Sequence, residues 1–214
     1  MSEEFLWCEK YRPSMIDECI LPERYKDIFH GFVSTGEIPQ LLLSGDSGMG
    51  KTTIARALCK ELKADVLFIK ASEDGNIDTL RTTIRKFAST VSLMGGYKIV
   101  ILDEADYLNA NSTQPALRSF TEEFSKNCRF IFTANYPNRI IKPLRSRLTE
   151  VEFKFTKKES VALAGKFMKR LKTILSIEDV DYDEKVVAEV IMKYFPDFRK
   201  VLSELQGFAA TGIS

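Results

Sequence analysis

The chain has 214 residues, of which 44% are hydrophobic and 29% are charged, so it can form one substantial core and a smaller companion. Its formal net charge of +1 excludes a broadly basic coat, so any contact with DNA must be local. Its four cysteines form no CxxC pair and His30 is its single histidine, which excludes a zinc-ligand spacing and favours reduced thiols.

The sequence also lacks the signals of export. No apolar run approaches the roughly 18 to 20 residues of a membrane helix. The acidic start, Met-Ser-Glu-Glu-Phe, is unlike the basic and then apolar layout of a secretory signal. We therefore expect a cytoplasmic protein that makes no membrane contact.

Short apolar runs alternate with segments of helical period through residues 1–155, which is typical of a mostly parallel sheet with helices on its faces. We predict strands at Leu41–Ser44, Val66–Ile69, Ile99–Asp103, Arg129–Thr133 and Val151–Phe155. Apolar spacings of three and four predict the intervening helices, with faces made of Ile54, Leu58 and Leu62, then Ile77, Leu80, Ile84, Phe87 and Val91, then Leu117, Phe120 and Phe124.

Only helical patterns remain after Phe155. They comprise Val161, Ala164, Phe167, Met168 and Leu171, then Val186, Val190, Ile191 and Tyr194, then Val201, Leu202 and Leu205. We place a boundary near Thr156. The chain is thus expected to hold an α/β domain over 1–155 and a small all-helical domain over 156–214.

A phosphate-binding loop is predicted between the first strand and the helix that follows it. The stretch from Gly45 to Thr52 fits GxxxxGK[ST], and the strand-to-helix setting separates it from an ordinary glycine turn. Its main-chain N–H groups can surround phosphate oxygens, Lys51 can reach the β and γ phosphates, and the Thr52 hydroxyl can bind Mg²⁺. The candidate nucleotide-binding residues are Gly45, Asp46, Ser47, Gly48, Met49, Gly50, Lys51, Thr52 and Thr53. The Asp46 side chain must point outward, because a carboxylate would repel phosphate.

Two adjacent carboxylates end the strand at Ile99–Asp103, within the segment Lys98–Asp106 (KIVILDEAD). Carboxylates at the end of a buried strand are costly unless a cation or a chemical role awaits them. We expect Asp103 to hold Mg²⁺ and Glu104 to activate water for attack on the γ-phosphate. Asn135 ends the next strand, where its amide can orient the same water or simply form a turn.

Several motifs together identify a family. The stretches EKYRPSMIDECI, LDEAD, TANYPNRIIKPLRSRL and FPDFRKVL resemble the small ATPase subunit of sliding-clamp loaders, among the AAA+ ATPases, with the T-even-type phage loader as the nearest likeness. The likeness covers nearly the whole chain. It implies a P-loop AAA+ fold with a parallel five-stranded sheet and a helical lid, ATP and Mg²⁺ as cofactors, and the cytoplasm of an infected bacterium as the location.

The resemblance also assigns roles by position. Tyr11, Arg12 and Pro13 match the segment that lies against the nucleotide base, with Ile20 as an apolar wall. Asn135 matches a sensor of the γ-phosphate. Arg147 matches the arginine finger that completes a neighbouring subunit's site, although Leu148 replaces the usual cysteine after it. Arg199 matches the second sensor; it follows a helix start at Pro196 and Asp197, where the helix dipole disfavours a cation unless a phosphate lies near.

Further implied contacts involve DNA and the clamp. Arg81 and Arg85 lie four apart, opposite the apolar face of their helix, and the resemblance makes them contacts to the DNA backbone rather than a solvated face. At one position where the resembling family has a basic residue, this sequence has Asn76. Leu93 and Met94 are either core residues or a clamp-docking surface. Gln114 matches a position that links DNA contact to the catalytic carboxylate.

The resemblance therefore implies a DNA-stimulated ATPase whose partners are other loader subunits, a sliding clamp and primer–template DNA. Two alternatives stay open: another DNA-acting member of the class, such as a helicase loader or branch-migration motor, and a nucleotide-binding scaffold that rarely hydrolyses. Loader small subunits also carry a helical collar domain that holds the ring together. We expect this sequence, which has no room for a collar, to be monomeric and nearly inactive alone.

Overall fold

A computed structural model describes residues 5–73, 77–92 and 96–209. Five parallel strands form one sheet in the order β2-β3-β4-β1-β5. The strands span Leu41–Gly45 (β1), Asp65–Lys70 (β2), Lys98–Asp103 (β3), Cys128–Ala134 (β4) and Thr149–Phe153 (β5). The predicted fold class is confirmed. Because the strands are parallel, the carboxyl ends of β1, β3 and β4 meet at one edge of the sheet, which is where the candidate site residues follow them.

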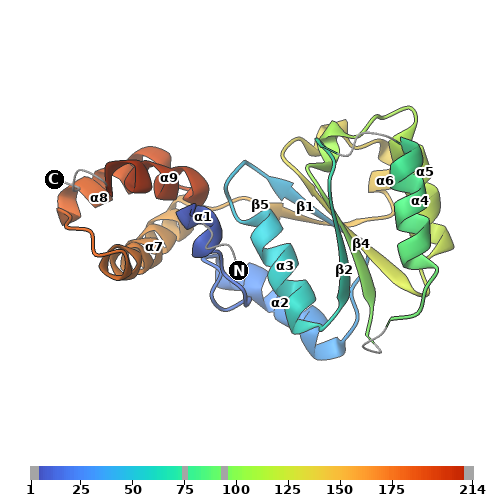
Figure 1. The fold of residues 1–214 in the computed structure, drawn as a ribbon, viewed down its shortest axis with the longest axis horizontal. Coiled ribbons are helices and arrows are strands. Elements are labelled where there is room, and N and C mark those ends of the chain that lie inside the picture. Colours follow the sequence, from blue (N-terminus) through green and yellow to red (C-terminus); the bar gives the residue numbers. More distant parts are fainter. Residues whose placement is uncertain (1–4, 74–76, 93–95, 210–214) are drawn as a thin grey trace.

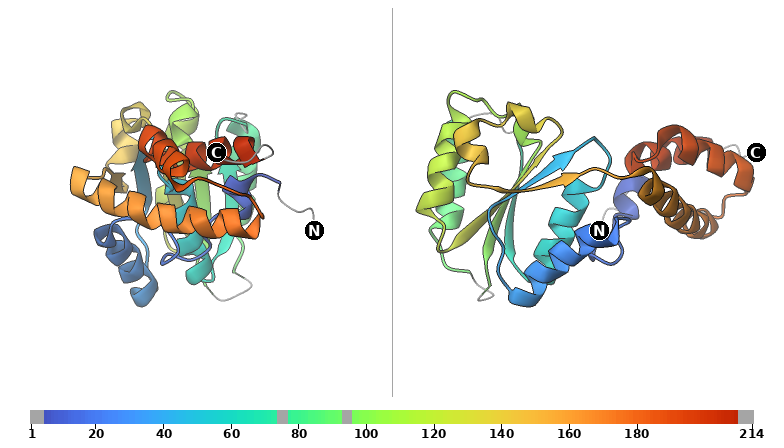
Figure 2. Two further views of the ribbon diagram at one scale, coloured as in Figure 1. Left: turned by 90° about the vertical axis from the view of Figure 1, so that its left-hand side faces the viewer. Right: turned by 180° about the vertical axis from the view of Figure 1, so that it is seen from behind.

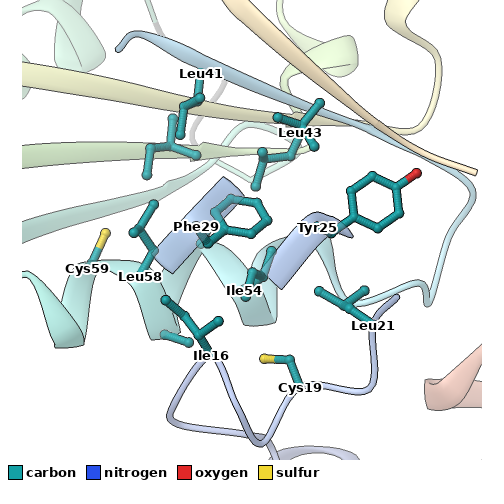
Figure 3. Close-up of a cluster of buried hydrophobic side chains, with 14 of the residues drawn as sticks. Ile16, Cys19, Leu21, Tyr25, Phe29, Leu41, Leu43, Ile54, Leu58 and Cys59 are labelled. Carbon is teal, nitrogen blue, oxygen red and sulfur yellow. The ribbon is translucent and has the colours of Figure 1, made fainter. Parts of the chain in front are cut away.

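Helices cover both faces of the sheet (Figure 1). On one face lie α2 (Glu23–Thr35) and α3 (Lys51–Glu61), and on the other lie α4 (Ile77–Ala88), α5 (Thr113–Glu123) and α6 (Lys142–Arg145). Leu41 and Leu43 of β1 belong to the core under α2 and α3, whereas Leu42 belongs to the core under α4 and α5. Figure 3 shows the first core, in which Tyr25 and Phe29 face the sheet. A strand buried on both faces needs a continuous apolar run, as β1 has.

The helices that follow the sheet in the described residues are α7 (Lys157–Ile177), α8 (Glu184–Tyr194) and α9 (Phe198–Ala209). Thr156 begins α7 through a capping box, since its side chain accepts from the Glu159 N–H and its own N–H donates to the Glu159 carboxylate. These helices share a core of their own, which also includes Trp7 from the short helix α1 (Trp7–Lys10). The Trp7 N–H donates to Gln206 Oε1 at 3.0 Å. The amino-terminal segment therefore packs on the unit formed by α7, α8 and α9, which we call the lid (Figures 1 and 2).

Three details of the predicted elements are wrong. Strand β5 lies two residues earlier than predicted at both ends, because its pairing with β1 begins at Leu41 and Thr149. Val91 lies beyond the end of α4 and is 88% exposed. At the end of that helix the Lys98 ammonium donates to the Phe87 carbonyl at 2.8 Å, which satisfies a carbonyl of the last turn. Val161 is 76% exposed on α7, outside the stripe of buried leucine, isoleucine and phenylalanine side chains.

Two further features concern the described residues alone. No helix among them has both the length and the apolar character needed to cross a bilayer. The cysteines Cys8, Cys19, Cys59 and Cys128 are all free, and burial raises the pKa of Cys19 and of Cys59 to about 12. The buried Cys19 and Cys59 thiols therefore stay protonated at neutral pH and behave as core side chains.

Candidate nucleotide site

The loop between β1 and α3 wraps around the Lys51 ammonium. Lys51 is the first residue of α3, and its Nζ donates to the carbonyls of Gly45 at 2.8 Å and Asp46 at 2.7 Å. Gly50 is the N-cap of this helix at φ 90°, and no side chain caps the helix. The first N–H groups of α3 are thus available to an anion. Asp46 is exposed, as expected if its carboxylate is to avoid phosphate.

The Lys51 side chain is only 7% exposed. Burial lowers the pKa of Lys51 to about 8, because desolvation disfavours the charged form; the negative charges of Asp103, Asp106 and Asp46 oppose this and the positive charge of Arg199 adds to it. Its Nζ also donates to Asn135 Oδ1 at 2.8 Å. The predicted lysine and the predicted sensor, Asn135 just after β4, therefore touch each other.

The predicted metal ligands are in contact at the end of β3. Thr52 Oγ1 donates to Asp103 Oδ1 at 2.5 Å, and Thr133 Oγ1 donates to the same oxygen at 2.7 Å. Hydroxyl and carboxylate oxygens are the donors that Mg²⁺ prefers. Among the described residues no group of three or more His, Cys, Asp or Glu side chains could hold a metal. Two oxygen ligands with water and phosphate completing the shell suit Mg²⁺, so the residues fit this ion.

Glu104 follows Asp103 with a left-handed backbone at φ 57° and ψ 41°. Its N–H donates to Thr133 Oγ1 at 3.0 Å, and its carboxylate accepts a hydrogen bond from Ser72 Oγ at 2.5 Å. The conformation is uncommon for a residue with a side chain. Ser72, just after β2, thus holds the candidate base on one side.

The lid contacts the phosphate loop through the start of α9. The Phe198 N–H donates to the Gly48 carbonyl at 3.2 Å. A Cβ at Gly48, where φ is 75°, would meet Asp197 Oδ1 at 1.9 Å, so only glycine fits. Asp197 in turn accepts from the Lys200 N–H at 2.9 Å and so caps α9. Arg199, in the first turn as predicted, is exposed and lines the same pocket as Lys51.

The amino-terminal segment forms the other wall. Tyr11, Arg12, Pro13 and Ile20 line the pocket with Lys51. Arg170 of α7 fixes this wall, because its guanidinium donates to the Tyr11 carbonyl at 2.8 Å and the Glu18 carbonyl at 2.9 Å. The Tyr11 hydroxyl donates to Glu178. Burial is the main reason that the pKa of Tyr11 is raised, so the tyrosine stays neutral.

One pocket between sheet, lid and amino-terminal segment therefore gathers most of the predicted site residues. They are Tyr11, Arg12, Pro13, Ile20, Ser47, Gly48, Met49, Gly50, Lys51, Thr52, Thr53, Asp103, Glu104, Asn135 and Arg199. Gly45 and Asp46 reach this site through their carbonyls, which accept from Lys51. The pocket also has apolar walls in Phe167, Phe198 and Leu202 of the lid.

Four other predicted residues lie outside the pocket. Arg147 follows α6 and pairs with Glu122 of α5. Gln114 is fully buried; its amide donates to the carbonyls of Leu108 and Arg139, both at 3.0 Å, and accepts from the Ile141 N–H at 2.7 Å. It joins the segment after β3 to the segment before α6 without touching Glu104.

Arg81 and Arg85 are both exposed on α4, opposite the buried Leu80 and Ile84, as the helical period predicted. Arg85 leans toward α5, where its guanidinium lies 3.4 Å from Glu123. The possible clamp-docking residues Leu93 and Met94 lie outside the described residues, as does Asn76.

Several residues of the site went unpredicted. Ser72, Thr133 and Arg170 carry no motif, and their roles depend on strand pairing and on the lid position rather than on spacing along the chain. Asp197 was recognised as a helix start, but its contact with Gly48 was not. The GxxxxGK[ST] pattern allows any residue at position 48, so the glycine found there was the sequence feature that could have indicated this close contact.

Known proteins match both the sheet and the helices that follow it. Residues 41–156 match the ATPase family associated with various cellular activities (AAA), and residues 159–213 match the AAA+ ATPase lid domain of the sliding-clamp-loader large subunit. The chain is 40% identical to the sliding-clamp-loader large subunit of Escherichia phage RB69, over 99% of its own length and 67% of that protein's. It is 39% identical to the replication factor C small subunit of Archaeoglobus fulgidus, over 97% and 65% of the two lengths.

A solved structure shares the fold. The Thermotoga maritima RuvB Holliday junction branch migration motor aligns with a TM-score of 0.69 at 24% identity, covering 92% of this chain and 64% of that one. The chain thus spans about two thirds of the length of the relatives it matches. The matches over both the sheet and the lid place it in the AAA family of nucleotide-binding ATPases, and within that family it belongs to the ATPase subunits of sliding-clamp loaders.

Proposed function

We propose that the chain binds ATP with Mg²⁺ and hydrolyses it in order to hold and then release an open sliding clamp around primer–template DNA. The observation that carries the proposal is the single pocket in which Lys51, Thr52, Asp103, Glu104 and Arg199 converge. A cationic amine, paired oxygen ligands, a second carboxylate and a lid arginine are the groups that phosphoryl transfer requires.

Binding depends on the loop and on the lid. The amides at the start of α3 and the Lys51 ammonium hold the β and γ phosphates, while Tyr11, Arg12, Pro13 and Ile20 lie against the base. Thr52 and Asp103 would hold Mg²⁺, which when bound neutralises charge that builds up on the phosphate oxygens. Arg199 approaches the γ-phosphate from α9, which links the position of the lid to the nucleotide.

Hydrolysis requires a base and a water. Glu104 accepts the proton of the attacking water, and Asn135 orients that water. To do so, the Glu104 carboxylate must leave Ser72, to which it is hydrogen-bonded at 2.5 Å. Arg147 lies outside the pocket of its own subunit and is half-exposed, so it can reach the pocket of an adjacent subunit. There its positive charge stabilises the negative charge of the transition state.

Partners follow from the same arrangement. Arg81, with Arg85, contributes a few phosphate contacts to DNA from the exposed side of α4, which suits a chain whose net charge is only +1. Gln114 carries the effect of DNA binding toward the end of β3, since it bridges the backbone after β3 to that before α6. Neighbouring loader subunits and the clamp complete the assembly.

The test replaces the proposed base. In a loader reconstituted with its companion subunits, clamp and primed DNA, Glu104→Gln should keep ATP affinity and lower turnover by about a hundredfold or more. Glu37→Gln, at an exposed position outside the pocket, is the matched control. Normal turnover in Glu104→Gln would refute the assignment of the base, and the absence of stimulation by primed DNA and clamp would refute the proposed task.

A further inference from the structure

We propose that Glu122 is a positioning residue for the arginine finger, holding the Arg147 guanidinium in the orientation in which it meets the nucleotide of the neighbouring subunit. This inference rests on the proposed function, since it concerns how Arg147 acts across the interface. Glu122 carries no predicted role and lies near the end of α5, 25 residues before the finger.

Arg147 is held at two points. Its Nε donates to Glu122 Oε1, and its Nη1 donates to the Pro143 carbonyl at 2.6 Å. A guanidinium has five N–H donors in a rigid plane, so these two bonds fix the plane and leave the Nη2 edge for phosphate oxygens. Within the described residues, neither hydrogen bonds nor ion pairs engage that edge.

The exposure and charge of the Arg147–Glu122 pair suit a positioning role. The Arg147 side chain is 32% exposed and the Glu122 side chain is 55% exposed, so the pair lies at the surface where another subunit can approach. The hydrogen bond from Arg147 lowers the pKa of the Glu122 carboxyl, which therefore stays ionised near neutral pH. A lone surface ion pair contributes little to stability, so a Glu122 substitution should leave the fold intact.

The short helix α6, which directly precedes the finger, is itself fixed to the sheet. Arg145 of α6 donates from Nε at 2.8 Å and from Nη2 at 2.6 Å to Glu150 Oε2 of β5. The other Glu150 oxygen accepts from Ser44 Oγ of β1 at 2.8 Å, and Ser44 directly precedes the phosphate loop. The backbone just before Arg147 is thus fixed to the sheet. The Arg147 side chain can still rotate, and its bond to Glu122 restricts that rotation.

The experiment measures ATP turnover in the reconstituted loader with clamp and primed DNA. Glu122→Ala should lower kcat about tenfold and Glu122→Gln about threefold, with KM changed less than about twofold, because misdirection of a transition-state group affects kcat. Added to Arg147→Ala, Glu122→Ala should cause no further loss. Glu184→Gln, which breaks an exposed pair with Lys172 away from the pocket, is the matched control and should leave kcat unchanged.

The outcomes separate this inference from the function on which it rests. A wild-type loader without turnover, or an Arg147→Ala loader as active as the wild type, would refute the trans-acting finger itself. If Arg147→Ala is impaired but Glu122→Gln and Glu122→Ala are as active as the wild type or more so, Glu122 does not position the finger. The proposal would also be overturned if Glu122→Ala lowered kcat further when added to Arg147→Ala. It would equally be overturned if the loss of kcat in the Glu122 variants came with a lower thermal unfolding temperature.

Discussion

The pKa of Lys51 leads to a sharp prediction about nucleotide binding. Burial lowers this pKa to about 8 in the free protein. A triphosphate placed against the ammonium favours the charged form and raises the pKa again, so binding above pH 8 must take up a proton. The affinity for ATP should therefore fall as the pH rises through the pKa of the free protein, since less of the protein carries the charged lysine.

The size of the effect follows from the titration curve. A group of pKa about 8 is roughly three quarters protonated at about pH 7.5 and about 3% protonated at about pH 9.5. If the lysine stays charged in the complex, the affinity falls about 25-fold over this interval, which is about 2 kcal/mol. The terminal phosphate of ATP is already largely ionised throughout this range.

The assay is calorimetric titration of ATP with Mg²⁺ at both pH values, each in two buffers of different ionisation enthalpy. The buffers report the protons taken up, which should approach one per ATP at the higher pH. Lys51→Arg should remove the dependence, because arginine stays charged, and Lys172→Arg should retain it. An affinity that is constant with pH in the wild type, or proton release on binding, would refute the role of a charged Lys51.

Three more substitutions test other parts of the site. Ser72→Ala should raise DNA-independent ATP turnover about two- to fivefold, because it frees the Glu104 carboxylate; unchanged turnover would contradict this restraint. Gly48→Ala should weaken ATP binding about tenfold or more, since its Cβ displaces Asp197 and the start of α9; an affinity equal to the wild type would contradict the lid contact. Arg81→Ala should lower the salt dependence of DNA binding by the assembled loader by roughly one unit of slope; an identical slope would exclude a phosphate contact.

Motifs whose residues are neighbours in the sequence were predictable from it. The apolar run of β1, the glycines after it and Lys51 lie next to each other, so the loop and its helix could be recognised directly. The same holds for Asp103 and Glu104 at the end of β3. Parallel strands then bring the Asn135 end of β4 beside them, which explains why Lys51 and Asn135 meet although 84 positions separate them.

Contacts that depend on tertiary packing were not predictable. Ser72 reaches Glu104 only because β2 pairs with β3 and its end turns toward the neighbouring strand. The Arg170 contact with the amino-terminal wall requires the orientation of α7 on the sheet domain, which no local pattern encodes. Val161 shows the converse error: its spacing fits a helical face, but the face that is buried is set by the helices packed against α7.

The proposed function requires that a magnesium-bearing triphosphate occupies the pocket between the phosphate loop and the lid. A crystal structure of the chain with a non-hydrolysable ATP analogue and Mg²⁺ tests it most directly. We expect phosphate oxygens within hydrogen-bond distance of Lys51 Nζ and of the first amides of α3, with the metal at Thr52 and Asp103. An analogue bound elsewhere, or a loop that remains closed on Lys51 at saturating analogue, would contradict it.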